Sequence, residues 1–155
     1  MQLHIGTKQV TAQPMTRQAY NDYRGWTLPA DEDGTDEGYL VEYLDGGKPN
    51  HPAHAGYISW SPKAQFDAAY RPTTGMTFGL AIEVLKAGKR VARAGWNGRG
   101  MWLKLVPNSL ADYVAFQHEA LNPLPWIGMK TADECFVPWV ASQTDALADD
   151  WQIVT

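Results

Sequence analysis

The stretch Thr77–Arg93, TFGLAIEVLKAGKRVAR, joins a capped helix to the first strand of a sheet. Thr77 is a favoured N-cap residue, and apolar side chains then recur at helical spacing, at Phe78, Ala81, Ile82 and Leu85. Gly88 ends the helix, because glycine readily adopts the left-handed conformation that follows many helices. The next segment, Arg90–Arg93, is short and predicts a strand.

Alternating and apolar segments downstream predict more strands. They lie at Met101–Val106, Ile127–Thr131, Cys135–Trp139 and Trp151–Val154. The glycine-rich Gly95–Gly100 is typical of a tight connection, since Asn-Gly accepts positive φ at low cost. Serine followed by aspartate three positions later predicts capping boxes for short helices after Ser109 and Ser142. The fold class is therefore α+β: a short helix followed by a small, mostly antiparallel sheet.

A separate small α+β module is predicted over residues 14–71. It contains a helix at Arg17–Arg24 capped by Thr16, and strands at Tyr39–Leu44 and Tyr57–Trp60. A second helix is expected after Ser61-Pro62, with serine as its cap and proline at its first position. A Pro/Thr/Gly segment at 71–75 is interpreted as a linker, which leaves residues 76–155 as the second domain.

The charges are unevenly distributed along the chain. Formal net charge is −4, with 13 basic and 17 acidic residues. The segment between Val84 and Ala111 nevertheless has basic residues and no acidic ones: Lys86, Lys89, Arg90, Arg93, Arg99 and Lys104. A locally basic segment suits a small anion, whereas the acidic remainder disfavours a long nucleic acid. Solvated surface charge around one helix end is an equal alternative.

Residue patterns typical of enzymes are missing from the sequence. Cys135 is the single cysteine, without a paired catalytic histidine, and its apolar strand predicts burial. No Gly-x-Ser-x-Gly elbow is present, and His51 with His54 offers only two of the ligands that a metal needs. We therefore expect no catalysis, metal or cofactor. We also expect no membrane span, and location in the cytoplasm because a secretory signal is not apparent.

The segment Val137–Asp145 is the most unusual polar stretch. Ser142 and Asp145 are explained as caps, but Gln143 and Thr144 are surplus to capping and lie just beyond Trp139. A binding role for this segment is therefore predicted beside its capping role.

Several long motifs carry a resemblance to a known family. They are Met76–Ile82, Lys89–Trp102, Met129–Asp133, Val137–Asp145 and Asp150-Trp151. These motifs resemble the phage Thoeris anti-defence two family over residues 76–155. The first module is similar to a small phage-encoded segment of unknown activity that often precedes this domain, carried by Tyr20–Trp26 and Gly56–Pro62.

The resemblance implies a non-catalytic sponge for a signalling nucleotide. Family members bind the cyclic ADP-ribose isomer made by bacterial TIR defence proteins, and some bind cyclic dinucleotides. The family also implies a homo-oligomer, a tetramer with pockets between subunits, in the cytoplasm of the infected host. Ligand-binding residues implied here are Trp96, Asn97, Arg99, Met101, Lys130, Trp139, Ser142, Gln143, Thr144 and Asp145.

Within that set, a tryptophan at 96 or 139 is expected to stack on the base. Amide and carboxylate side chains read base or ribose edges, and Arg99 with the basic strand Arg90–Arg93 faces the diphosphate. Three alternatives remain open at this point: an enzyme that hydrolyses a nucleotide signal, a nucleic-acid-binding phage accessory protein, and a virion-associated part whose tryptophans serve assembly.

Overall fold

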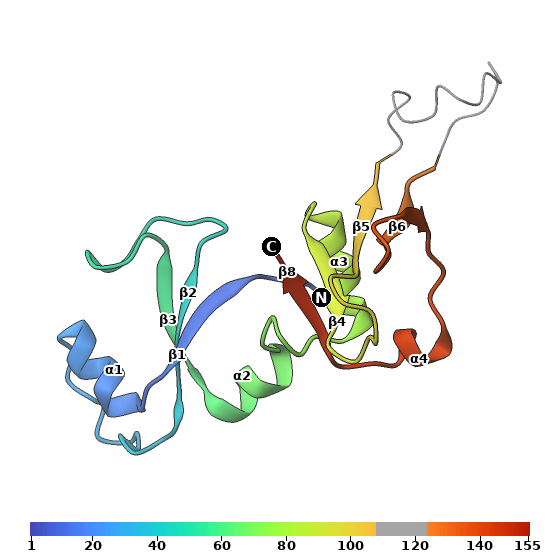
Figure 1. The fold of residues 1–155 in the computed structure, drawn as a ribbon. Coiled ribbons are helices and arrows are strands. Elements are labelled where there is room, and N and C mark those ends of the chain that lie inside the picture. The colour runs from blue at the N-terminus through green and yellow to red at the C-terminus, as the bar shows by residue number, and fades with distance from the viewer. Residues whose placement is uncertain (108–123) are drawn as a thin grey trace. The chain divides into compact units, whose positions relative to one another are not determined.

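A computed structural model describes residues 1–107 and 124–155. Over these residues the chain forms two compact units, Met1–Tyr70 and Arg71–Thr155, each with its own antiparallel sheet (Figure 1). The described residues form four helices and two antiparallel sheets, which confirms the α+β class. No described helix has the length and apolar character needed to cross a membrane. The predicted helix after Ser109 lies outside the described residues.

Unit 1, residues 1–70, has a three-stranded sheet with two helices. Its strands are β1 (Val10–Pro14), β2 (Gly38–Tyr43) and β3 (Tyr57–Pro62), and they pair in the order β1-β2-β3. Helix α1 (Arg17–Arg24) follows β1, and α2 (Lys63–Ala69) follows β3. The core of the unit gathers Tyr20, Leu40 and Ile58, with Met15 and Trp60 packed against them.

The predicted helix cap is confirmed at α1 and is wrong at α2. Thr16 Oγ1 accepts from Ala19 N, and Gly25 ends α1 with φ 67°. Ser61 was predicted to cap α2, and that prediction is wrong. Strand β3 continues through Pro62, which becomes the N-cap position without a side-chain bond, because Ser61 is already paired with Tyr39 of β2.

Unit 2, residues 71–155, has one helix, α3 (Phe78–Lys86), ahead of a five-stranded sheet. The strands are β4 (Arg90–Arg93), β5 (Trp102–Val106), β6 (Trp126–Lys130), β7 (Phe136–Pro138) and β8 (Trp151–Val154). Their order is β7-β6-β5-β4-β8, and the short helix α4 (Gln143–Ala146) lies between β7 and β8. The last strand thus returns to pair with the first.

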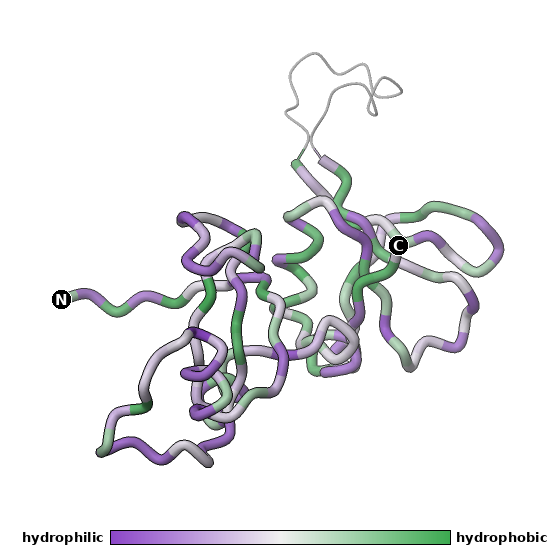
Figure 2. The backbone as a smooth tube through the Cα atoms, turned by 90° about the vertical axis from the view of Figure 1, so that its left-hand side faces the viewer, coloured by the Kyte–Doolittle hydropathy of each residue, from purple (hydrophilic) through white to green (hydrophobic). Residues whose placement is uncertain are grey.

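The core of unit 2 lies between α3 and one face of this sheet. Val91 is paired with Leu103 on one side and Ile153 on the other, and α3 contacts all three of these strands. Fully or almost fully buried residues are Met76, Ala81, Val84, Leu85, Val91, Leu103 and Trp151. Figure 2 shows the hydrophobic residues of α3 in green. Thr77 accepts from Leu80 N, so the predicted cap is confirmed.

Cys135 lies outside the core. It is exposed and precedes β7, which spans only Phe136–Pro138 rather than the predicted Cys135–Trp139. The expectation of a buried cysteine is wrong because β7 is an edge strand whose three residues are all exposed. Alternation along such an edge does not create a buried face.

Candidate functional site

The centre of the predicted site is an arginine held by two carboxylates. Arg93 ends β4, and its Nε donates to Asp150 Oδ1 over 2.7 Å while Nη1 donates to Asp145 Oδ1 over 2.9 Å. Nη1 also lies 3.4 Å from the carbonyl oxygen of Thr144. Asp150 Oδ2 accepts from the Gly95 amide over 2.8 Å. Arg93 thereby ties the start of the 95–100 loop to the segment that contains α4.

These contacts alter the acid–base chemistry of all three charged groups. The bond from Arg93 lowers the pKa of Asp150, with a further contribution from the Gly95 amide. Burial pushes the pKa of Asp145 upward, but donors from Ser142, Arg93 and Trp96 outweigh it and lower that pKa overall. The two carboxylates in turn raise the pKa of Arg93. All three groups are therefore ionised, and the two carboxylates leave the cluster with one net negative charge.

Four aromatic rings pack beside this cluster. Trp151 is fully buried, and its ring centroid lies 5.5 Å from that of Trp96 and 6.0 Å from that of Trp139. Phe78 of α3 completes the group, 5.4 Å from Trp151. Trp96 and Trp139 are partly exposed, so each contributes to the core and to the surface.

Two indole N–H groups of this cluster donate hydrogen bonds to Asp145. Trp96 Nε1 donates to Asp145 Oδ1 over 3.2 Å, and Trp151 Nε1 donates to the Asp145 carbonyl oxygen over 3.0 Å. Asp145 is thus the point where the 95–100 loop, α4 and β8 meet. Its side chain stabilises the fold, which leaves little of it for a ligand.

The predicted capping box at α4 is confirmed. Ser142 Oγ accepts from the Asp145 amide over 3.0 Å and donates to Asp145 Oδ2 over 2.7 Å. Gln143 and Thr144, between them in sequence, are exposed. Neither side chain makes a polar contact within residues 1–107 and 124–155.

The 95–100 loop has the same division between supporting and exposed side chains. Asn97 and Arg99 are exposed, without polar side-chain partners in the described parts of the chain. Met101 packs against Gly98, where a Cβ atom would overlap the methionine sulfur. Lys130 of β6 donates to the Gly100 carbonyl oxygen over 3.2 Å and pairs with Glu134.

The ten predicted residues therefore fall into two groups. Six take part in local packing or hydrogen bonding: Trp96, Met101, Lys130, Trp139, Ser142 and Asp145. Four present polar side chains to solvent: Asn97, Arg99, Gln143 and Thr144. The Trp96–Asp145 bond joins the two segments that contain the exposed four.

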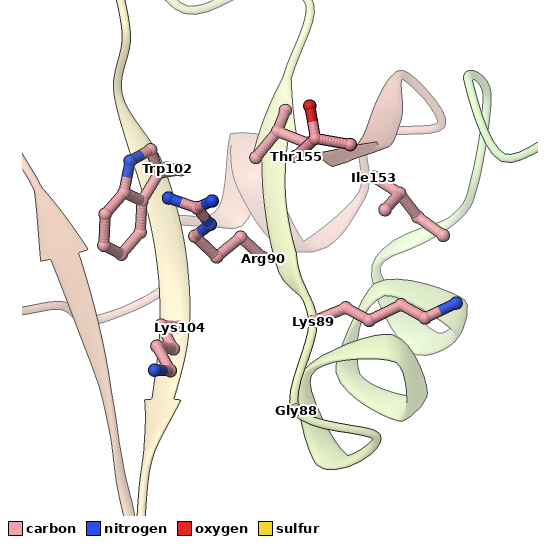
Figure 3. A pocket seen from close by; sticks show the side chains of 8 residues that line it. Gly88, Lys89, Arg90, Trp102, Lys104, Ile153 and Thr155 are labelled. Carbon is pink, nitrogen blue, oxygen red and sulfur yellow. The ribbon is translucent and has the colours of Figure 1, made fainter.

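An open pocket lies on the sheet near β4, β5 and β8. Its volume is about 530 Å³, and its lining residues are Gly88, Lys89, Arg90, Trp102, Lys104, Ile153, Val154 and Thr155. Figure 3 shows the Arg90 side chain beside Trp102, with Lys104 further along β5. The guanidinium carbon lies 4.9 Å from the Trp102 ring centroid, a cation–π arrangement. No acidic residue is among these lining residues.

Comparison with known proteins covers this same unit. A family model described as the Thoeris anti-defense 2-like domain matches residues 76–154. The protein "Thoeris anti-defense 2" of Bacillus phage SP01 is 46% identical over 87 residues, which span 53% of this chain and 98% of that protein. The chain belongs to the Thoeris anti-defense 2-like family. Unit 1 lies outside the matched residues.

Within the Thoeris anti-defense 2-like unit, sequence reasoning did not single out the pocket around Trp102. Arg90 and Lys104 belong to the basic segment, whose strand Arg90–Arg93 was expected to face the diphosphate. Trp102 ends one of the family motifs, but no ligand-binding role was predicted for it or for Lys104. Alternation along β5 was the available signal, because it places Trp102 and Lys104 together on the face opposite Leu103. Arg90 joins them only because β4 lies next to β5 in the sheet, and this strand order could not be read from the sequence pattern.

Proposed function

We propose that this chain counters Thoeris defence by binding a cyclic ADP-ribose-type immune signal and holding it unchanged. Its family supports the anti-defence role. The observation that carries the binding proposal is the Trp96–Asp145 hydrogen bond of 3.2 Å. This bond joins the 95–100 loop to α4, and each segment presents two polar side chains without partners among the described residues.

The exposed groups match the chemistry of such a ligand. A cyclic ADP-ribose isomer contains an adenine, two riboses and a diphosphate. The amides of Asn97 and Gln143 and the hydroxyl of Thr144 suit base and ribose edges, since each amide both donates and accepts. Arg99 suits the diphosphate, because a guanidinium makes paired, charge-assisted hydrogen bonds with phosphate oxygens. The part-exposed rings of Trp96 and Trp139 offer stacking surfaces.

The remaining predicted residues have supporting roles in this proposal. Met101 and Lys130 hold the 95–100 loop against the β6–β7 connection through Gly98 and Gly100. Ser142 and Asp145 hold the first turn of α4. Such support matters because a pre-organised site loses less conformational entropy when the ligand binds.

The pocket around Arg90, Trp102 and Lys104 is a second candidate location for a nucleotide of this class, cyclic dinucleotides included. Its Arg–Trp stack offers a ring and a cation together, and Lys104 adds a second positive charge. None of these lining residues has an acidic side chain that would repel phosphate. Variants at the two locations distinguish them.

We further propose that the protein acts as a homo-oligomer, a tetramer by resemblance, in the cytoplasm of the infected host. Large apolar side chains exposed near the β7 edge support self-association: Phe136, Val137, Val140 and Leu147. Exposed apolar patches of this kind often mark protein interfaces. A pocket closed by a second subunit excludes water from the ligand and thereby strengthens its polar contacts.

Calorimetric titration with TIR-made cyclic ADP-ribose isomers tests the proposal. A signal sponge must outcompete the defence receptor, so we expect nanomolar affinity or better, about −12 kcal/mol. Heating the complex and analysing the released ligand by mass spectrometry must return it intact. Failure to bind any isomer or a cyclic dinucleotide, or recovery of a hydrolysed product, contradicts the proposal.

Variants then locate the ligand. Asn97→Ala and Arg99→Gln are expected to weaken binding at the loop, and Arg90→Gln with Lys104→Gln tests the sheet pocket. Lys86→Gln is the matched control, because Lys86 is exposed and paired with Glu83 on α3. If only the Arg90 and Lys104 changes reduce affinity, the ligand occupies the sheet pocket rather than the loop.

A further inference from the structure

Unit 1 contains a pocket that lies outside the residues matched by the family model. The pocket is formed between helix α1 and strand β3 and has a volume of about 660 Å³. Its chemistry depends on six of its lining residues: Arg17, Tyr20, Arg24, Trp26, Tyr57 and Trp60. Pockets of a few hundred Å³ with aromatic walls and a few polar groups are typical of small-molecule sites.

Two arginine–tryptophan stacks line this pocket. The Arg24 guanidinium carbon lies 4.2 Å from the Trp26 ring centroid, and that of Arg17 lies 4.3 Å from the Trp60 ring centroid. Both arginines belong to α1 and are separated by seven positions, so they lie on the same side of the helix. The N–H groups of a stacked guanidinium lie in its own plane and point past the edge of the aromatic ring. They therefore remain available to an anion.

The two arginines differ in their charge environment. Arg17 Nη1 pairs with Glu32 over 2.6 Å, and its Nε lies 3.4 Å from Asp36 Oδ2. Arg24 instead donates from Nη1 to the Tyr20 hydroxyl over 3.3 Å. Within the described residues no carboxylate forms an ion pair with Arg24. The pocket therefore contains one guanidinium that carries an uncompensated positive charge.

Aromatic surface is exposed next to that charge. Trp26 is 51% exposed and Tyr57 is 46% exposed, although both line the pocket. Large rings are costly to leave in water, and an exposed tryptophan offers stacking area to a planar ligand. The cation and the stacking surface thus occur together, at Arg24 and Trp26.

The walls of the pocket are held rigidly by unit 1. Asn50 Nδ2 donates to the Ile58 carbonyl oxygen and Asn50 Oδ1 accepts from the Ile58 amide, each over 2.8 Å. Trp60 Nε1 donates to the Met15 carbonyl oxygen over 2.9 Å. Tyr20 is only 6% exposed and belongs to the core. These bonds hold the Trp60 ring and the β3 wall of the pocket, and none of them involves Arg24.

We propose that this pocket binds a small planar anion of the nucleoside monophosphate class. Its single phosphate pairs with Arg24, and its base stacks on Trp26 beside Tyr57. A guanidinium and a phosphate form strong paired hydrogen bonds, and the ring adds stacking energy. Neither group requires a metal or a covalent step.

The surrounding charge favours a single phosphate over a polymer. The 31–37 segment, which includes the pocket residue Glu32, contains five carboxylates: Asp31, Glu32, Asp33, Asp36 and Glu37. A nucleic acid backbone running past Arg24 would bring further phosphates near these charges and be repelled. One phosphate on Arg24 avoids that cost.

Nuclear magnetic resonance of the full chain tests the proposal at residue level. The probes are adenosine monophosphate, adenosine, inorganic phosphate and an oligothymidylate. The Trp26 indole N–H signal, assigned through Trp26→Phe, separates this pocket from nucleotide binding in unit 2. We expect adenosine monophosphate to shift this signal, and adenosine or phosphate alone to shift it less at equal concentration.

Variants at Arg24 make the expectation quantitative. Arg24→Gln is expected to weaken binding about tenfold or more, because a charge-assisted bond is lost. Arg24→Lys keeps the charge but loses the planar fork, so it should give an intermediate affinity. Lys63→Gln, in the same unit but outside the pocket, is the matched control and should leave the Trp26 titration unchanged.

Three results overturn the proposal. One is a Trp26 signal that does not move at millimolar adenosine monophosphate. Another is an Arg24→Gln chain whose unshifted core signals show it folded and whose affinity equals that of the parent. The third is tighter binding of the oligothymidylate than of the mononucleotide, which would assign the pocket to a polymer.

Discussion

Arg93 Nε donates to Asp150 Oδ1 over 2.7 Å and so connects two residues 57 positions apart in the chain. The same guanidinium reaches Asp145, whose side chain also accepts from Trp96 and whose backbone amide donates to Ser142, the N-cap of α4. Through Arg93, the antiparallel pairing of β4 with β8 is coupled to the loop and helix that present the proposed ligand-binding groups.

Arg93→Leu is expected to destabilise unit 2. It leaves two partly buried carboxylates without their shared cation, which costs roughly 1–3 kcal/mol as lost charged hydrogen bonds. Urea denaturation followed by tryptophan fluorescence measures the change. Lys86→Gln is the control, because exposed ion pairs contribute about 1 kcal/mol or less. Equal stability of the two variants would show that the Arg93 contacts are not structural.

Stability is expected to fall in acid through the same cluster. The pKa of Asp150 is lowered mainly by the bond from Arg93, and that of Asp145 is lowered by its donors against the effect of burial. Both groups are ionised above their ordinary pKa of about 4, where they stabilise the fold. Their contribution is lost as pH falls through the lowered folded-state values.

Asp150→Asn tests this pH dependence. The parent should lose more free energy of unfolding than the variant between about pH 6 and pH 3, because the variant binds no proton at that position. The variant keeps a weaker slope from other carboxyls with a lowered pKa, including Glu42 and Asp133. Parallel curves for the two chains would contradict the assignment.

Trp96 and Asn97 are neighbours in sequence with different expected variant effects. Trp96→Phe removes the N–H that Asp145 accepts and should cost about 1 kcal/mol of stability. Asn97→Ala removes an exposed amide and should leave stability within about 0.5 kcal/mol. Thermal denaturation of both chains beside ligand titration separates the effects. A stability loss at Asn97 comparable to that at Trp96 would count against a binding role.

Gly56→Ala is expected to disrupt unit 1. A Cβ at this position would overlap the Tyr43 carbonyl oxygen of the paired strand, and a backbone atom in a ladder cannot easily move aside. The cost should reach the range of about 1–3 kcal/mol seen when overpacking forces backbone shifts. Gly6→Ala is the control, since nothing lies within 4 Å of the added atom. Denaturation midpoints of the two chains provide the comparison.

The sequence correctly predicted helix ends that depend only on residues close together in the chain. The α3 cap at Thr77, the α1 stop at Gly25 and the α4 box of Ser142 with Asp145 each involve residues within a few positions, and each is confirmed. Strand β1 was not predicted, because Val10–Pro14 is short and almost entirely exposed. Its pairing with β2 comes from backbone hydrogen bonds that leave no hydrophobic pattern.

The sequence by itself determined the α+β class, the family of unit 2 and the set of polar residues proposed to bind a ligand. Only the tertiary structure decided which of those side chains pack or hydrogen-bond within the protein and which remain exposed. Asp145 and Trp96 are 49 positions apart, and the return of β8 to β4 brings them together. The pairing of β4 with β5 likewise decided the Arg90–Trp102 stack, because contacts across a sheet depend on which strands are neighbours, and strand order cannot be read from local periodicity.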